Sequence, residues 1–394
     1  MFQKKYTLFS VLGFPVRLSP TWFIIAFLIA WSLARGLFPR YYQGLSLGTY
    51  WIMGVVGAIG LFACVLAHEL GHSIVANRFG LRMRGITLFL FGGVSEMPDE
   101  APTPKAEVAM ALAGPMVSIA LGTLLYFGGY VVDAIPVRGV VLWLAAINVI
   151  LAAFNLVPGL PLDGGRVLRA GLWKWKGDIL WATRVASRAG GLIGLALIGL
   201  GIANLLMGSL IGAVWWGILG LFLRGAAKMA YRQMLFRQML SDTSVEYFAD
   251  EETETVPSDI SVGEFVHDYV YRSDHRFFIA RRDGERLGCI DVERVKDVPD
   301  DRWEEEAIGQ YAQDCSEANS IEAGEPAVTA WKRMQNRQAD RLLVTNDGEA
   351  IGEIRLNDIY RYLRRRMEME GQAASRPPAA LSSNPLEHVR DSGH

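Results

Sequence analysis

Charged residues are absent from a long internal stretch of this chain. Residues 51–67 contain no Asp, Glu, Lys, Arg or His, which argues against a solvated surface helix. A helix rises about 1.5 Å per residue, so about 20 such residues cross the hydrocarbon layer of a bilayer. We therefore predict that this stretch belongs to a transmembrane helix over Gly48–Phe79.

Cysteine is also scarce, and only Cys64, Cys289 and Cys315 occur. Three cysteines make no disulfide framework, and they indicate a reducing compartment for the soluble part of the chain. Cys64 lies one helical turn before His68, where we expect a small buried hydrophobic residue; the alternative is that its thiol approaches a metal. A net charge of −2 gives no support for nucleic-acid binding. No A-x-A-like site follows the first apolar run, so we expect no cleavable signal peptide.

The charges that are present divide the chain into two parts. Hydrophobic residues make up 51% and the mean hydropathy is +0.21, values between those of a soluble protein and a pure membrane bundle. Charged residues are sparse from Tyr6 to Leu223 and dense from Arg224 onward. This predicts a polytopic α-helical membrane domain at 1–240, a cytoplasmic α/β domain at 241–366 and a disordered tail at 367–394.

The apolar runs predict about six transmembrane helices. The expected spans are Leu18–Leu37, Gly48–Phe79, Lys105–Val132, Val137–Val157, Leu180–Met207 and Leu210–Leu223. Lys and Arg cluster at alternate connections, while the remaining connections hold only Arg35, Arg40 and Arg138. By the positive-inside rule, this pattern places both the N-terminus and the C-terminal domain in the cytoplasm of a prokaryotic-type cell.

The second span ends in His68-Glu69-Leu70-Gly71-His72. His68 and His72 are four residues apart, so both imidazoles lie on one face of the helix. This geometry suits two ligands of one tetrahedral zinc ion. Glu69 points to the side, where it can take a proton from a zinc-bound water. A chance match is disfavoured because idle charges are costly inside an apolar span.

A third protein ligand is expected, because catalytic zinc usually takes three. The membrane half has no other histidine, which leaves a carboxylate or a cysteine. Asp163 lies in a Pro- and Gly-rich break after the fourth span, and broken membrane helices form ion sites. We expect Asp163 to be that ligand; the alternative is an N-cap of the next helix. Asn155 would hold the substrate carbonyl or the developing oxyanion, or else make a helix–helix hydrogen bond.

The segment 81–97 differs from the spans around it. Its run 86–91 is rich in strand formers, and Gly92-Gly93 then breaks the run. We predict a short re-entrant β-hairpin or loop beside the metal. If the run is an edge strand, its backbone would pair with an unwound substrate segment. The residues predicted to bind substrate are Ile86, Thr87, Leu88, Phe89, Leu90, Gly92, Gly93 and Asn155.

Together, these motifs resemble the site-2 protease family of intramembrane zinc metalloproteases. The resemblance covers about residues 8–230, and it is carried by the motif at 68–72, by Asn155…Pro158…Leu162-Asp163-Gly164, and by Phe91-Gly92-Gly93 and Ala113-Gly114-Pro115. It implies a zinc metalloendopeptidase that cleaves a transmembrane segment of another membrane protein. It also implies that His68, His72 and Asp163 bind zinc, that Glu69 is the catalytic glutamate and that Asn155 contacts the substrate.

Beyond Asp242, a helix–strand–turn–strand–helix pattern occurs twice, at 262–298 and 327–366. It resembles a tandem pair of cystathionine-β-synthase (CBS) domains, a regulatory module. In that family a Thr or Ser, and an Asp three residues later, hold an adenosine ribose. The second repeat keeps Asp358 but has Arg355 in place of the hydroxyl, and the first repeat keeps neither residue. We therefore expect adenine nucleotides to bind weakly or not at all.

Two other functions would use the same membrane residues. A metal transporter or metal-gated sensor, regulated by the CBS-like pair, would use the ligands for transit, but it gives Glu69 no distinct role. A pseudoprotease would only bind membrane clients, and the intact ligand set argues against it. The protease function implies Zn²⁺ as cofactor, with a transmembrane protein substrate and the lipid bilayer as partners; an adenine nucleotide and a second copy of the chain are further candidates.

The predicted topology can be tested by labelling cysteines introduced at chosen sites. We expect a cysteine at Leu45 to react with a membrane-impermeant reagent added from outside the cell, because this connection carries few basic residues. A label at this position that is reachable only from the cytoplasmic side would contradict the predicted orientation.

Overall fold

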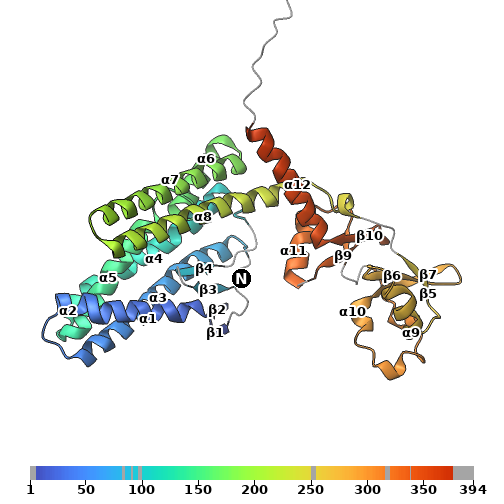
Figure 1. Cartoon of the computed structure of the whole chain (residues 1–394), viewed down its shortest axis with the longest axis horizontal. Helices are drawn as coiled ribbons and strands as arrows, with labels where there is room; N and C mark the ends of the chain where they lie inside the picture. Colours follow the sequence, from blue (N-terminus) through green and yellow to red (C-terminus); the bar gives the residue numbers. More distant parts are fainter. Residues whose placement is uncertain are drawn as a thin grey trace, which may run out of the picture. The chain divides into compact units, whose positions relative to one another are not determined.

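The structure is a computed structural model, shown in Figure 1. It describes residues 6–81, 85–89, 92–95, 100–249, 254–315, 320–337 and 339–375. Contacts divide the chain into two units, 1–235 and 236–394. The division falls within one helix, α8 (Leu210–Ser241), so the chain passes from one unit to the other without a loop.

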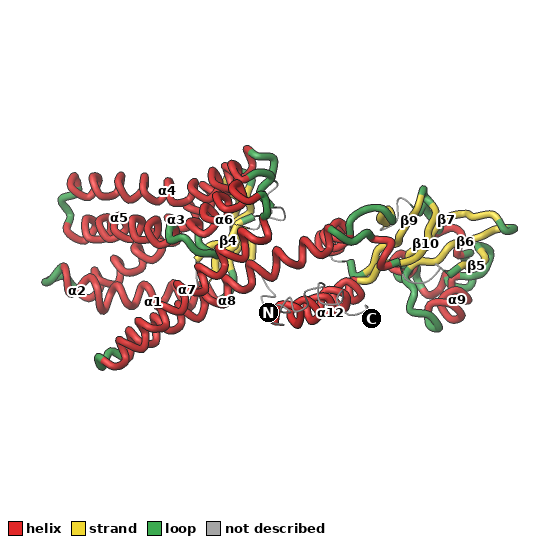
Figure 2. The backbone as a smooth tube through the Cα atoms, turned by 90° about the horizontal axis from the view of Figure 1, so that it is seen from above, coloured by secondary structure: helices red, strands yellow, loops and turns green. Residues whose placement is uncertain are grey.

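The first unit is a bundle of long apolar helices. Its helices are α1 (Thr21–Ser32), a π-helical turn (Leu33–Leu37), α2 (Phe38–Tyr41), α3 (Leu47–Arg78), α4 (Pro104–Val131), α5 (Ile135–Asn155), α6 (Asp163–Lys176), α7 (Ile179–Leu206) and α8. Among the described residues, six helical segments are long and apolar enough to cross a membrane. The prediction of about six spans is therefore confirmed. Within the bundle, the helices α4 and α5 run side by side (Figure 2).

Polar caps fix where several of these helices begin. The Ser46 side chain accepts a hydrogen bond from the Thr49 backbone N–H at 3.2 Å, at the start of α3. Thr103 caps α4 in the same way through the Ala106 N–H, and Pro104 occupies the first helical position. Such caps satisfy backbone donors that a helix leaves unpaired at its N-terminus. They place these helix starts within a few residues of the starts expected from the sequence.

A four-stranded sheet lies at the end of α1 that is away from α2 (Figure 1). Its strand order is β1 (Tyr6–Val11), β2 (Phe14–Leu18), β3 (Ile86–Phe89) and β4 (Gly92–Ser95). The strands β3 and β4 form the predicted hairpin, and β2 runs parallel to β3. The strands before α1 were not predicted, and because β2 contains Leu18 the first span begins later than expected.

The position of β3 contradicts one prediction. Val16–Leu18 of β2 pair with one side of Ile86–Leu88, and β4 pairs with the other side. The expectation of an edge strand is therefore wrong for Ile86–Leu88, since these residues already have strand partners on both sides. Gly92 and Gly93 do not end the β structure but begin β4, which is the free edge on this side. Leu90 and Phe91 fall outside the described residues.

The second unit contains the predicted pattern twice, and this confirms the CBS-like fold class. The sheet of the first repeat has the order β5 (Thr255–Pro257), β6 (Phe277–Arg282) and β7 (Glu285–Asp291). The sheet of the second repeat consists of β8 (Ser320–Glu322), β9 (Arg341–Asn346) and β10 (Glu349–Arg355). The helices of the first repeat are α9 (Val262–Phe265), which continues into a π-helical turn, and α10 (Val292–Val295). The helices of the second repeat are α11 (Ala327–Arg337) and α12 (Leu356–Ser375).

In both hairpins the turn of the predicted pattern falls at an Asp-Gly pair. The φ angles are 52° and 82° at Asp283 and Gly284, and 49° and 81° at Asp347 and Gly348. Positive φ at both central residues is the signature of the tight turn that matches the twist of paired strands. At its C-terminal end, α12 continues to Ser375, so the helix extends past residue 367, where the disordered tail was expected to begin. Residues 376–394 fall outside the described part of the chain.

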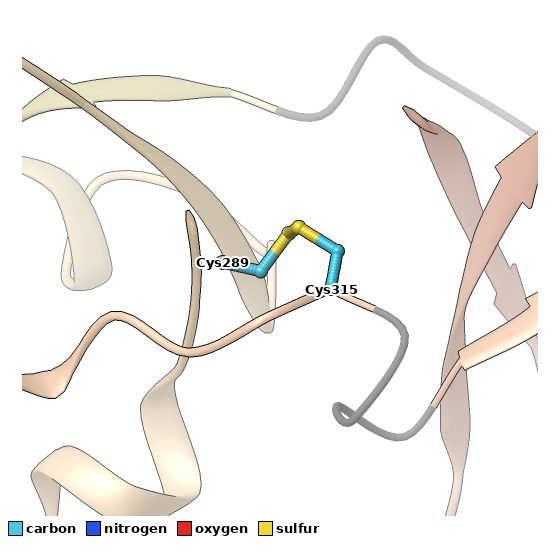
Figure 3. Close-up of a disulfide and its surroundings, with 2 residues drawn as sticks. All are labelled: Cys289 and Cys315. Atoms are coloured by element: carbon cyan, nitrogen blue, oxygen red, sulfur yellow. A yellow bond between two sulfur atoms is a disulfide. The ribbon is translucent and has the colours of Figure 1, made fainter. Parts of the chain in front are cut away.

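The cysteine prediction is wrong for the second unit. Cys289 of β7 and Cys315 form a disulfide, with their Cα atoms 5.0 Å apart (Figure 3). Reciprocal backbone hydrogen bonds between Cys289 and Gln313, at 2.8 and 3.0 Å, bring the two cysteines together. The pair packs against Phe277 and Leu343, which come from the two repeats. This disulfide removes the sequence-based argument for a reducing compartment. Cys64 is a free, buried core residue, as expected.

Candidate metal centre and active site

Three residues far apart in the sequence converge in the first unit. His68 and His72 of α3 meet Asp163, the first residue of α6. The Nε2 atoms of both histidines lie 3.2 Å from Asp163 Oδ2 and 3.2 Å from each other. All three residues are buried, at 3%, 4% and 8% exposure. Among the described residues, this is the group whose ligand atoms are close enough to hold a metal ion.

The spacing of these atoms fits zinc. Bonds of about 2.0–2.1 Å to a tetrahedral Zn²⁺ place neighbouring ligand atoms about 3.3 Å apart. The three distances of 3.2 Å match that edge length. Two imidazoles and one carboxylate also match the ligand types that catalytic zinc sites use. A buried trio of this kind without a cation would leave nitrogen lone pairs facing a carboxylate, so the donor set fits a bound ion.

Helix α4 packs against this trio through a position without a side chain. A Cβ atom placed on Gly114 would lie 2.6 Å from His68 Nε2, and closer still to His72 Nε2. A methyl group there would occupy the space between the two ligand nitrogens. Glycine at this position is therefore required by the site itself. The sequence analysis noted Gly114 as part of a motif, but this reason for it needs the tertiary structure.

Each histidine also has a partner for its second ring nitrogen. His72 Nδ1 lies 2.7 Å from the Met110 carbonyl oxygen, and His68 Nδ1 lies 2.9 Å from Ser118 Oγ. Partners of this kind orient a metal-binding imidazole and fix its tautomer. Met110 and Ser118 were missed by the sequence analysis. A signal for Ser118 was present, because it is a polar residue one turn after Gly114 in an apolar span.

Close backbone packing places Asp163. The N–H of Leu160, in the loop before α6, donates to the Ala186 carbonyl of α7 at 3.1 Å. Cβ atoms on Gly164 or Gly165 would overlap the backbone of this same loop. Leu162 occupies the N-cap position, so the expected N-cap alternative for Asp163 is wrong. An acidic side chain in the first turn is still favourable, because it faces the positive end of the helix dipole.

A buried ion pair joins the two helices that surround the site. Arg169 of α6 donates through Nε to Glu107 Oε1 of α4 at 2.6 Å. Glu107 is fully buried and Arg169 is 9% exposed. Breaking such a pair by removing one partner costs about 3–5 kcal/mol, because an unpaired charge is left behind. The pair fixes α6, which carries Asp163, against α4, which carries Gly114. The sequence analysis did not identify this pair.

The remaining predicted site residues have different surroundings. Glu69 is half-buried, and its backbone carbonyl accepts a hydrogen bond from Ser73 Oγ at 2.9 Å. Asn155 is the last residue of α5, is half-buried, and donates from Nδ2 to the Leu151 carbonyl at 3.0 Å. Ile86 and Thr87 are buried in the sheet. Ile86 packs with β2 against Val65, Leu66 and Leu70 of α3, so the sheet lies beside the helix that carries the histidines.

The chain is similar to known zinc metalloproteases. The model of the family "Peptidase family M50" matches residues 56–137 and 129–198. The putative zinc metalloprotease Rip3 of Mycobacterium tuberculosis is 35% identical, over 90% of this chain and 91% of its own. The solved site-2 protease of Methanocaldococcus jannaschii is 29% identical, covers 58% of this chain and 95% of its own, and has a TM-score of 0.42.

The second unit is also similar to a solved structure. The CBS domain of a bacterial CNNM/CorC family Mg²⁺ transporter, solved in complex with ATP, covers 34% of this chain and 95% of its own at 11% identity, with a TM-score of 0.28. For the whole chain, the Rip3 match extends over nine-tenths of both sequences and includes the metal cluster. The chain therefore belongs to Peptidase family M50, and it is a zinc metalloprotease of the site-2 protease type.

Proposed function

We propose that this protein is an intramembrane endopeptidase that cleaves a transmembrane segment of another membrane protein. The observation that carries the proposal is the buried His68, His72 and Asp163 cluster, set within helices long and apolar enough to span a bilayer. As a family member with six such helices, the chain is a multi-pass membrane protein. A protease whose active site lies among membrane helices suits a substrate that is itself in the membrane.

We assign the zinc ligands to His68 Nε2, His72 Nε2 and Asp163 Oδ2, on the basis of the spacing described above. When bound, zinc supplies a Lewis acid that lowers the pKa of water and polarises the scissile carbonyl. Glu69 is the general base. It takes the proton of the attacking water at its carboxylate and delivers that proton to the leaving amine. Glu69 is half-buried, whereas both histidines are buried.

Asn155 is proposed to hold the substrate backbone. Its Nδ2 already donates to the Leu151 carbonyl, which fixes the amide at the end of α5. An amide nitrogen carries two hydrogens, so a second donor is present for a substrate carbonyl oxygen or a developing oxyanion. Asn155 and Asp163 flank the same break between α5 and α6. One loop would then place a zinc ligand and a substrate contact.

The substrate must present an extended backbone, because a helix occupies its carbonyls with internal hydrogen bonds. The interior position of β3 excludes Ile86–Phe89 as the pairing strand. The edge strand β4, Gly92–Ser95, takes that role in the proposal. An unwound substrate segment would add to this edge as a further strand, so main-chain bonds would give affinity without strict sequence preference.

The CBS-like unit is proposed to regulate activity or assembly rather than to bind a nucleotide tightly. The two residues at the ribose-type position form ion pairs within the chain. Asp358 pairs with Arg361 at 3.0 Å, and Arg355 pairs with Asp274 at 3.3 Å. The side-chain hydrogen bond from Arg341 holds the pKa of Asp274 below its usual value. A nucleotide would have to displace these partners. The positive-inside pattern supports a cytoplasmic location for this unit and for the N-terminus.

The metal site is tested by adding one methyl group. We expect wild-type protein to hold about one zinc per chain, and Gly114→Ala to lose it, because the new Cβ occupies the space between the histidine nitrogens. Gly128→Ala on the same helix is the matched control, since its Cβ meets nothing within 4 Å. Zinc is measured by elemental analysis of purified protein, and Asp163→Ala should also lose it. Full occupancy in Gly114→Ala would place the ion elsewhere.

The general base is tested with Glu69→Gln. This variant keeps the shape of the side chain but cannot accept the water proton, so cleavage should fall by about 10²–10⁴-fold while zinc content stays unchanged. The measurement is a Glu69-dependent fragment after co-expression with single-span membrane proteins. A variant that cleaves at the wild-type rate would exclude Glu69 as the base. If the wild-type protein cleaves nothing and Glu69→Gln transports zinc as well as the wild type does, the alternative function as a metal transporter would be favoured.

Strand addition is tested with proline in β4. In an edge strand alternate N–H groups face outward, so of Gly93→Pro and Val94→Pro one should remove a donor to the substrate. That variant should lose most cleavage while it keeps zinc. Leu8→Pro is the control, because Leu8 lies at the bulge in β1, the other edge of the sheet. If both β4 variants bind zinc and cleave normally, this edge does not hold the substrate.

A further inference from the structure

The two ligand histidines are held by different kinds of partner on α4. The partner of His72 Nδ1 is a backbone carbonyl, Met110 O, at 2.7 Å, whereas the partner of His68 Nδ1 is a side-chain hydroxyl, Ser118 Oγ, at 2.9 Å. Met110, Gly114 and Ser118 are four residues apart, so they lie on one face of the helix. On this face, the hydroxyl of Ser118 contacts His68 and the carbonyl of Met110 contacts His72. Gly114 lies against both rings.

This difference matters for the tautomer of each ring. A carbonyl only accepts, so neutral His72 must carry its proton on Nδ1, which leaves Nε2 with the lone pair that binds a metal. A hydroxyl donates or accepts, so it fixes the His68 tautomer only when it accepts from Nδ1–H. The position of the His68 proton therefore depends on a side chain that a point mutation can remove.

A possible hydrogen bond from His68 Nε2 to Asp163 competes with the bond from Nδ1 to Ser118, so the His68 tautomer depends strongly on Ser118. Asp163 Oδ2 lies 3.2 Å from His68 Nε2 and accepts a proton from that nitrogen if the ring carries one there. In that tautomer the lone pair of His68 points away from the ligand cluster. Ser118 and His68 are 0% and 3% exposed, so solvent water has little access to replace a missing partner on Nδ1.

We propose that Ser118 is the positioning residue of the metal site. Its hydroxyl accepts the Nδ1–H of His68, so that the Nε2 lone pair stays directed toward the ion and the competing bond to Asp163 is suppressed. This inference rests on the proposed role of His68 as a ligand. It adds a residue that contacts neither the ion nor the substrate but sets how tightly the ion is held.

The test measures zinc affinity by competition with a chelator, in purified full-length protein. Loss of such an outer partner lowers metal affinity by about 10–100-fold, and we expect this from Ser118→Ala. Ser118→Thr, which keeps the hydroxyl, should stay within a few-fold of wild type. Ser118→Val has the shape of threonine without the hydroxyl and should match Ser118→Ala. The absorption spectrum of the cobalt-substituted protein should shift in the Ala and Val variants only.

A control separates this role from a general loss of packing. Thr183→Val removes a buried hydroxyl that bonds the Ile179 carbonyl of its own helix at 2.7 Å, so it should not change zinc affinity. If the Thr and Val variants at position 118 do not fold, the zinc affinities and cobalt spectra of Ser118→Ala and Thr183→Val are compared instead. Wild-type zinc affinity and cobalt spectrum in Ser118→Ala would overturn the inference.

The proposed function fails in a different way. His68→Ala that retains full zinc would show that His68 is not a ligand, whatever Ser118 does. His68→Ala that loses zinc, together with Ser118→Ala that keeps it, would reject the positioning role alone.

Discussion

The first unit depends on one constraint, which is that polar groups inside an apolar bundle need partners. Two imidazoles and a carboxylate are buried among membrane-length helices, where their ligand atoms lie close enough together to hold a metal ion. The second nitrogens of both rings are satisfied from α4. The same rule explains the Glu107–Arg169 pair, in which two buried charges are tolerated because they bond each other.

These polar contacts require backbones to approach closely, and glycine permits the approach. Gly114 leaves the space between the ligand nitrogens, and Gly164 and Gly165 let α6 begin directly against the preceding loop. Side chains at these positions would push apart the elements that carry the ligands. Glycine therefore matters here for close packing around the buried cluster, which is separate from backbone flexibility. The ion pair between α4 and α6 then maintains the spacing that the glycines allow.

The small sheet lies beside the helix that carries the two histidines. Its core residues pack on α3 close to His68 and His72, and among the described strands its pairing order leaves β4 at an edge. An edge inside a membrane protein is a liability unless something pairs with it. A substrate that has lost its own helical hydrogen bonds would satisfy this edge while it is cleaved. In the second repeat of the other unit, by contrast, Arg355 and Asp358 at the ribose-type position form ion pairs within the chain.

The sequence alone predicted the six spans, the three ligand-type residues that the structure brings together and the two strand–turn–strand units, because each depends on local spacing or on an unbroken apolar run. Tertiary structure decided what depends on pairing between distant segments. The strand before α1 made β3 an interior strand, the Gln313 backbone brought Cys289 to Cys315, and the packing of α4 gave Ser118 and Met110 to the histidines. In each of these pairs the two residues are further apart in the sequence than one helical turn or one hairpin. Local sequence patterns therefore do not predict them.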